Sequence, residues 1–250
     1  MSNPKRVQLP PLDHFTGDAR VYERRSPSGK GRQVVKESVS LSERKTPQIF
    51  PDQSRISIRN EARAIQYVRK HTTIPVPFIV EFNDQPGAPV QLVTKFVKDG
   101  VPPKALQITP EGRARIVHQL EGYISQLQAL TDPECRSFAG PPLFAVRFEN
   151  AHLPLSDYKY RRYDADSPYV LCHGDLAWHN LLLDSETFEI KCVVDWEYAG
   201  FYPKEVESEY WRRPGPLAAM SSRDKDDKDD VLGVLWRHRV FDFPVKPASK

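Results

Sequence analysis

The chain has 250 residues, and its 36 basic and 33 acidic side chains leave a formal net charge of +3. This near balance gives no strong electrostatic argument for a nucleic-acid partner, and no segment approaches the run of about 20 apolar residues that spans a bilayer. Three cysteines in no metal-like cluster, and an N-terminus without the apolar core of a signal peptide, indicate a cytoplasmic protein in a reducing compartment.

The first hundred residues predict a small lobe preceded by an arm. Residues 1–20 are polar and rich in proline, which is typical of a flexible N-terminal arm. Residues 33–36 form a short strand candidate, and residues 90–97 predict another strand. Residues 98–103, which contain a glycine and two prolines, indicate a connector between two lobes.

Between these strands, residues 58–70 predict a helix with Ser57 or Asn60 as its N-cap. Glu61 and Ile65 are spaced at i and i+4, so Glu61 shares the apolar stripe that faces the interior. The sequence therefore predicts an inward-facing carboxylate on this helix.

The second half predicts a longer helix followed by irregular chain. Thr109 as cap and Pro110 in the first turn begin the helix, whose apolar positions recur at helical spacing. Residues 133–168 are irregular and rich in proline and aromatic residues. Residues 231–238 predict a last helix, and the mixed charge run at residues 223–230 is typical of a solvated loop.

Two short apolar runs, residues 170–172 and 190–194, predict buried strands that end in polar residues. These polar residues are His173, Gly174, Asp175, Asn180 and Asp195. Phosphoryl transfer needs a carboxylate that accepts the proton of the attacking hydroxyl, and an amide and a carboxylate that hold Mg²⁺ on the phosphates. Asp175 and Asn180 have the spacing of H-R-D-x-x-x-x-N in protein kinases, with Gly174 in place of the Arg.

These residues resemble the aminoglycoside phosphotransferase and choline kinase group of small-molecule kinases. The strings DWEYAGFYP at residues 195–203 and HTTIPVP at residues 71–77 are similar to fungal members of that group. The resemblance covers roughly residues 30–212. It implies an α+β, bilobal protein-kinase-like fold, with a small mixed α/β N-lobe at residues 21–98 and a mainly helical C-lobe at residues 99–250.

The resemblance also implies an ATP- and Mg²⁺-dependent phosphotransferase that acts on a hydroxyl group of a small molecule. Asp175 would be the catalytic base, which orients the hydroxyl and takes its proton. Asn180 and Asp195 would hold Mg²⁺, which prefers hard oxygen ligands. We expect a monomer or a weak dimer with no nucleic-acid or membrane partner.

Five residues are predicted to bind the nucleotide. By resemblance, Lys36 would contact the α- and β-phosphates, and Glu61 would hold Lys36 in place. ATP would lie next to the connector residues Lys95, Phe96 and Val97. The structural alternative is an ordinary surface Lys and an ordinary helix Glu.

Other polar residues near the motif have two interpretations each. His173 is expected to support the loop through hydrogen bonds, and His179 to face solvent or pack. An acceptor pocket or structural ion pairing would explain Glu197, Lys204, Glu205 and Glu207. An anionic substrate or a solvated surface would explain Lys159, Arg161 and Arg162.

Two alternatives stay open at this level. Gly29 and Gly31 supply two glycines but no G-x-G-x-x-G, so a catalytically impaired relative that binds a nucleotide or a partner is the first alternative. A metal-dependent hydrolase that uses His173, Asp175 and His179 with Asp195 is the second, and it predicts bound transition metal without ATP.

Overall fold

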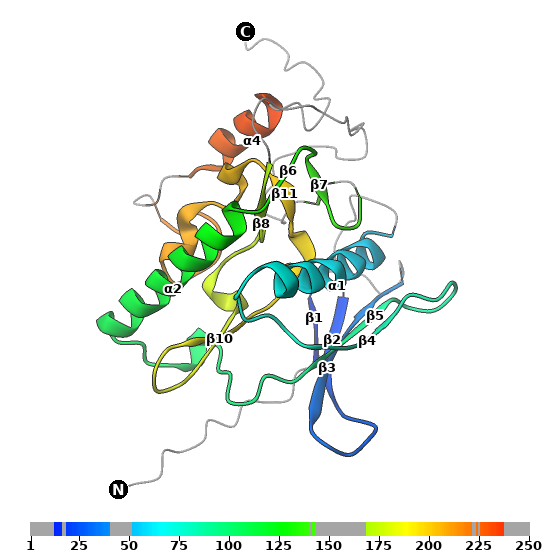
Figure 1. Cartoon of the computed structure of the whole chain (residues 1–250). Coiled ribbons are helices and arrows are strands. Elements are labelled where there is room, and N and C mark those ends of the chain that lie inside the picture. The colour runs from blue at the N-terminus through cyan, green and yellow to red at the C-terminus, as the bar shows by residue number, and fades with distance from the viewer. Residues whose placement is uncertain are drawn as a thin grey trace, which may run out of the picture.

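The computed structural model describes residues 13–16, 19–40, 52–140, 142–143, 169–221, 224 and 226–237. Five strands form an antiparallel sheet in the order β1-β2-β3-β5-β4, which with one helix makes the N-terminal lobe (Figure 1). The strands are β1 (Asp13–Thr16), β2 (Ala19–Arg25), β3 (Arg32–Ser38), β4 (Ile79–Asn83) and β5 (Gln91–Lys95). The strands predicted at residues 33–36 and 90–97 are thus present as β3 and β5.

The predicted arm is shorter than expected, because β1 and the start of β2 fall within residues 1–20. β1 pairs with β2 in antiparallel register, with Asp13 opposite Tyr22 and Thr16 opposite Ala19. Backbone pairing of this kind orders a polar segment that composition alone marks as loose. The rest of the predicted arm, residues 1–12 and 17–18, lies outside the described residues.

Helix α1 (Gln53–His71) confirms the predicted helix but begins five residues earlier. Asp52 occupies the N-cap position with a left-handed backbone, so Ser57 and Asn60 lie inside the helix and are not its cap. The early start is held by Ser54, whose hydroxyl oxygen accepts a hydrogen bond from the Val39 backbone at 3.1 Å. Glu61 is buried, as its place on the apolar stripe predicted.

The second lobe contains helix α2 (Pro110–Gln128), helix α4 (Lys228–Arg237) and two small antiparallel sheets. Thr109 caps α2 as predicted, since its hydroxyl accepts a hydrogen bond from the Gly112 backbone at 3.1 Å. One sheet pairs β9 (Leu181–Leu183) with β10 (Ile190–Val193). The other runs in the order β6 (Thr131–Asp132), β8 (Tyr169–Cys172), β11 (Gly200–Tyr202), β7 (Arg136–Ser137).

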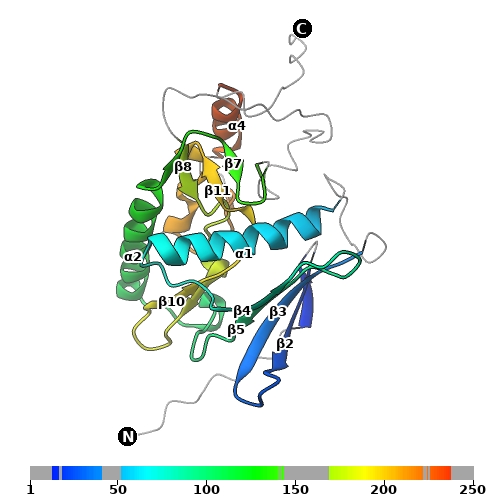
Figure 2. The ribbon, with the colours of Figure 1, turned by 45° about the vertical axis from the view of Figure 1, so that its right-hand side comes forward.

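A shared hydrophobic core joins the two lobes. α1 lies between the N-terminal sheet and the second lobe, as Figure 2 shows. Its Ile58 and Ile65 belong to the same buried cluster as Leu120 of α2, Leu171 of β8 and Trp196. Because burying one such side chain contributes about 1.5–3 kcal/mol, this core fixes α1 against both lobes.

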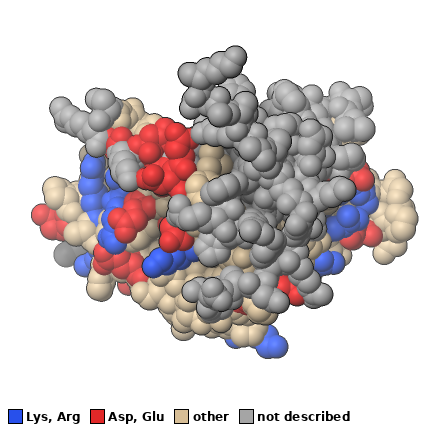
Figure 3. Space-filling model, turned by 90° about the horizontal axis from the view of Figure 1, so that it is seen from above, with Lys and Arg blue, Asp and Glu red and all other residues tan. Residues whose placement is uncertain are grey.

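The charge run at residues 223–230 is only partly a loop, because Lys228, Asp229 and Asp230 form the first turn of α4. Acidic side chains at a helix N-terminus are favourable because they face the positive end of the helix dipole. Figure 3 looks down on the end of the molecule that carries α4 and shows acidic side chains gathered on this face. None of the helices in the described parts of the chain has the length and apolar character to cross a bilayer.

Candidate functional site

A cleft of about 1800 Å³ opens between the lobes. Its walls include the predicted nucleotide-binding residues Lys36, Glu61, Lys95, Phe96 and Val97. The predicted metal-binding residues Asn180 and Asp195 line the same cleft. Asp175 is not among the residues that line the cleft, but its partly exposed carboxylate accepts a hydrogen bond from Asn180 at 3.1 Å. The structure therefore brings all eight predicted site residues to one place.

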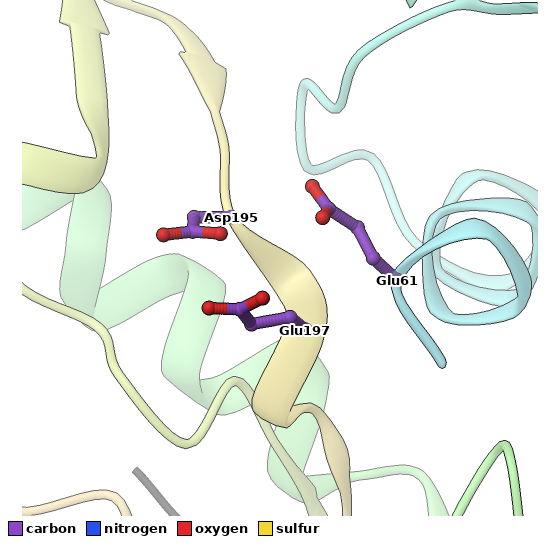
Figure 4. Close-up of side chains that lie close together, drawn as sticks. All are labelled: Glu61, Asp195 and Glu197. Carbon is purple, nitrogen blue, oxygen red and sulfur yellow. The ribbon is translucent and has the colours of Figure 1, made fainter. Parts of the chain in front are cut away.

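Lys36 lies within contact distance of three carboxylates. Its Nζ is 2.6 Å from Oδ1 of Asp195, 2.8 Å from Oε2 of Glu61 and 3.0 Å from Oε2 of Glu197. Figure 4 shows these carboxylates converging from α1 and from the turn after β10. Burial disfavours the charge on Lys36, but Asp195, Glu197 and Glu61 outweigh it and raise the pKa of Lys36 well above its usual value.

Three carboxylates around one ammonium leave an excess of negative charge, and a proton relieves it. Burial, together with the neighbouring Asp195 and Glu61, raises the pKa of Glu197 to about 8 despite the opposing effect of Lys36. Burial also acts on Asp195, but Lys36 outweighs it and lowers the pKa of Asp195. Near neutral pH, Lys36 and Asp195 therefore form the charged pair while Glu197 retains its proton.

The backbone at Asp195 directs this carboxylate toward Lys36. β10 ends at Val193, and the Val194 backbone N–H donates to the Asn180 carbonyl at 2.9 Å. Asp195 then adopts the left-handed conformation, with φ 66° and ψ 56°. A non-glycine residue in this region is uncommon. A short helical turn, Trp196–Tyr198, follows and presents Glu197 to the same ammonium.

Asn180 is oriented by Asp175. The Asn180 side-chain nitrogen donates to the backbone carbonyl of Asp175 at 2.8 Å and to its Oδ2 at 3.1 Å. These bonds occupy both amide protons. Neither bond uses the amide oxygen of Asn180, which is one of the residues that line the cleft.

Glu207 anchors the loop that carries Asp175. The buried Glu207 carboxylate accepts hydrogen bonds from the backbone N–H groups of His173, Gly174 (3.2 Å) and Leu176 (3.4 Å). Burial raises the pKa of Glu207, against the effect of His173 and of these N–H groups. The loop also needs a glycine: Gly174 has φ 84°, and a Cβ there would lie 2.6 Å from the Tyr198 carbonyl oxygen. A side chain such as the Arg of the kinase motif would therefore collide with Tyr198 in this backbone.

His173 is buried, and both of its ring nitrogens have partners. Its Nδ1 accepts from the Asp175 backbone N–H at 3.3 Å, so the Nε2 proton points to the Val194 carbonyl at 3.1 Å. Such a ring supports the loop, as its predicted role required, and has no nitrogen left for a metal. The metal-dependent hydrolase alternative therefore loses one of its ligands.

His179 is half-exposed and lies beside Asp175, with its Nε2 3.5 Å from Oδ2 of the carboxylate. The hydrogen bond to Asp175 outweighs burial and raises the pKa of His179. His179 lines the cleft. Its ring therefore contributes positive charge next to Asp175 at slightly acidic pH.

Several predicted features lie away from this site. Gly29 and Gly31 form the turn between β2 and β3, both with positive φ, and are not among the residues that line the cleft. Lys204 and Glu205 are exposed and do not contact it. Lys159, Arg161 and Arg162 lie outside the described residues.

Sequence reasoning missed the specific roles of two acidic residues. Glu197 is a third partner of Lys36, and its place two residues after Asp195, across a tight turn, is the signal that could have found it. Glu207 holds the loop that carries Asp175 from a position 32 residues further along the chain. No local pattern around Glu207 indicates that contact.

The donor set fits a hard divalent cation. Asn180, whose bonds to Asp175 do not use its amide oxygen, and Asp195, which contacts Lys36 through Oδ1, both line the cleft. One amide and one carboxylate oxygen suffice for Mg²⁺ when phosphates and water supply the other ligands. The space among the carboxylates of Glu61, Asp195 and Glu197 is not the cation site we describe, because the Lys36 ammonium already lies there.

Comparisons with known proteins found solved structures that share this fold. The solved structure of an aminoglycoside 3'-phosphotransferase of type VIII matches with a TM-score of 0.50 and 22% identity, over 82% of this chain and 79% of that one. The complex of an aminoglycoside 2''-phosphotransferase of type IIIa with GDP and kanamycin matches with a TM-score of 0.52 and 14% identity, over 83% and 73%. These similarities show the bilobal, protein-kinase-like fold.

A search of curated protein sequences found no match. The model of the phosphotransferase enzyme family, in contrast, matches residues 18–204. This match includes β3, α1 and the polar residues that line the cleft. The chain is therefore a member of the phosphotransferase enzyme family.

Proposed function

We propose that this protein transfers the γ-phosphoryl group of a nucleoside triphosphate, ATP in the first instance, to a hydroxyl group of a small molecule. One observation carries the proposal: the Lys36 ammonium lies 2.6 Å from Asp195 and 2.8 Å from Glu61, in a cleft that Asn180 also lines. A phosphoryl-transfer enzyme needs this combination of a phosphate-binding Lys, its Glu partner and oxygen ligands for Mg²⁺.

Each residue then has a defined task. Lys36 binds the α- and β-phosphates, and Glu61 keeps its side chain extended into the cleft. Asn180 and Asp195 would hold Mg²⁺, which neutralises charge on the phosphates when it is bound. The segment Lys95–Val97 would contact the nucleobase along the wall of the cleft.

Asp175 acts on the acceptor. Its carboxylate orients the hydroxyl and takes the proton as the hydroxyl oxygen bonds to the γ-phosphorus. The bond from that phosphorus to the β,γ-bridging oxygen breaks, and the nucleoside diphosphate leaves with the electron pair. The products are a phosphate monoester, the diphosphate and one proton.

The test combines binding with turnover. We expect MgATP to raise the melting temperature, since a ligand at 100 times its Kd stabilises a protein by about 2.7 kcal/mol. A panel of hydroxyl compounds should then yield an acceptor that promotes ADP release. MgGTP is run beside MgATP because the structurally similar enzyme was solved with GDP.

Asp175→Asn separates chemistry from binding. The variant should bind MgATP like the unaltered protein but lose turnover about 10²–10⁴-fold, which is the usual contribution of a catalytic base. Asp52→Asn is the matched control, because Asp52 is exposed, is not among the residues that line the cleft, and has a positive φ of 66° that Asn tolerates. The proposal is contradicted if neither MgATP nor MgGTP stabilises the protein at millimolar concentration.

A further inference from the structure

Asn60, next to Glu61 on α1, is a polar residue in the interior that the proposed mechanism does not use. Its exposed fraction is 0%. Asn is a poor residue for the middle of a helix, and a buried amide is costly unless it is hydrogen-bonded. Its position therefore calls for partners outside the helix.

Those partners belong to two distant segments. The side-chain nitrogen of Asn60 donates to the carbonyl oxygens of Glu197 and Ala199, both at 2.8 Å. The side-chain oxygen accepts from the Ala139 backbone N–H at 3.0 Å. Both amide protons are used, which is the full donor capacity of this side chain.

The two carbonyls lie within and directly after the turn whose carboxylates contact Lys36. Asp195 immediately precedes the helical turn Trp196–Tyr198, and Glu197 lies within it. Glu61, the third partner of Lys36, follows Asn60 directly on α1. One amide thus ties the helix that carries Glu61 to the turn that carries the other two carboxylates.

We propose that Asn60 is a positioning residue that latches α1 to this turn and so sets the Lys36 side chain for phosphate binding. α1 packs between the N-terminal sheet and the second lobe, so the latch joins elements from both lobes (Figure 2). The inference rests on the proposed function, because it assigns the latch to the phosphate-binding side of that site. Asn60 itself touches neither phosphate nor acceptor.

The latch predicts a selective defect. Asn60→Ala should leave nucleobase contacts at Lys95–Val97 intact but loosen the group around Lys36. We therefore expect adenosine to bind unchanged, MgATP to bind about tenfold more weakly, and turnover to fall by about 10–100-fold. A loss of packing alone would weaken adenosine and MgATP together.

Ile58→Val is the matched control, because Ile58 is a fully buried residue of the same helix whose apolar side chain cannot hydrogen-bond to the turn's carbonyls. It should lower the melting temperature and leave the ratio of adenosine to MgATP affinity unchanged. Asn60→Asp is the second variant, which keeps an oxygen for Ala139 while its carboxylate repels the two carbonyls. Isothermal titration with adenosine and with MgATP supplies the affinities.

The reactivity of Lys36 gives a measurement that needs no turnover. In the unaltered protein Lys36 is buried among carboxylates, so its acylation by an N-hydroxysuccinimide ester should be slow relative to that of the exposed Lys95. Asn60→Ala and Asn60→Asp should raise the ratio of Lys36 to Lys95 acylation by about tenfold, because local opening exposes the amine. Peptide mass spectrometry reads this ratio.

The outcomes separate the two proposals. If the unaltered protein binds no nucleotide, the proposed function fails, and the acylation ratio still tests the latch. If the protein binds MgATP but both Asn60 variants match Ile58→Val in affinity ratio and in acylation, the latch is overturned and Asn60 only packs.

Discussion

Around Lys36 the candidate site is held together by charge, whereas the loop at residues 173–180 is held by hydrogen bonds to its backbone. Lys36 reaches Asp195 across 159 residues of sequence, and both side chains are ionised near neutral pH. The loop, in contrast, depends on the Glu207 carboxylate and on a glycine with no room for a side chain. The first region should therefore respond to the loss of its lysine and to pH, and the second to a side chain at Gly174 or to a weaker acceptor at Glu207.

The largest expected effect comes from Lys36→Met, which leaves the buried Glu61 and the partly buried Asp195 without their cation. Breaking a buried ion pair on one side costs about 3–5 kcal/mol. The cost should be greater at pH 8 than at pH 5, because loss of the cation raises the carboxylate pKa values in the folded form only, and stability then falls as pH rises. Urea unfolding at both pH values measures this free energy.

Lys95→Met is the control for that prediction, since Lys95 is an exposed lysine on β5 of the same sheet. Its unfolding free energy should change by less than about 0.5 kcal/mol. Equal losses for the two variants at both pH values would mean that the charges around Lys36 do not hold this region together.

Gly174→Ala tests the loop by shape alone. The alanine must keep the left-handed backbone of Gly174, which costs about 1–2 kcal/mol. Its Cβ must also displace the Tyr198 carbonyl, which costs a further amount of about 1–3 kcal/mol. Gly29→Ala is a matched control, because Gly29 also has a positive φ, 70°, but nothing lies within 4 Å of its Cβ. Thermal unfolding should show a clearly larger loss at Gly174, and similar losses would mean that the loop can move away from Tyr198.

Glu207→Gln keeps the shape of the anchor and removes its charge. Hydrogen bonds to a charged group contribute about 1.5–3 kcal/mol, and the Gln amide also offers fewer acceptor sites to the three backbone N–H groups. We expect a loss of about 2 kcal/mol in urea unfolding. Glu205→Gln, at an exposed position in the same segment, should change stability by less than about 0.5 kcal/mol. If Glu207→Gln behaved like this control, the anchor would act by shape and not by charge.

These two regions also differ in how far the sequence predicts them. The loop is visible locally, because Asp175 and Asn180 have a fixed spacing and follow a short apolar strand. The capped start of α2 and the inward position of Glu61 are visible for the same reason, since periodicity and capping act over a few residues. β1 was missed because pairing with β2, not composition, orders it.

Contacts between segments that are distant in sequence could not be predicted from such local patterns. Asn60 is a residue type that favours N-caps, yet α1 begins seven residues before it. Its side-chain amide instead contacts Glu197, 137 residues further along the chain. Glu197 was compatible with an acceptor pocket until β10 and the left-handed Asp195 placed it beside Lys36. In both cases the role depends on which segments pack together, and no window of sequence contains that information.

Glu197→Gln has the smallest expected effect at acidic pH, where its stability should equal that of the unaltered protein, and the effect should grow as pH rises. In the folded protein the pKa of Glu197 is about 8, against an ordinary value of 4.5. Between these values the unfolded chain has released the proton while the folded form retains it, so the unaltered protein loses stability as pH rises through this window. Gln resembles the protonated acid and cannot ionise. The variant should therefore match the unaltered protein below about pH 4.5 and become progressively more stable relative to it up to about pH 8. Urea unfolding of both proteins across this range measures the difference, and a difference that stays flat would mean that Glu197 is ionised beside Lys36, with the excess charge balanced elsewhere.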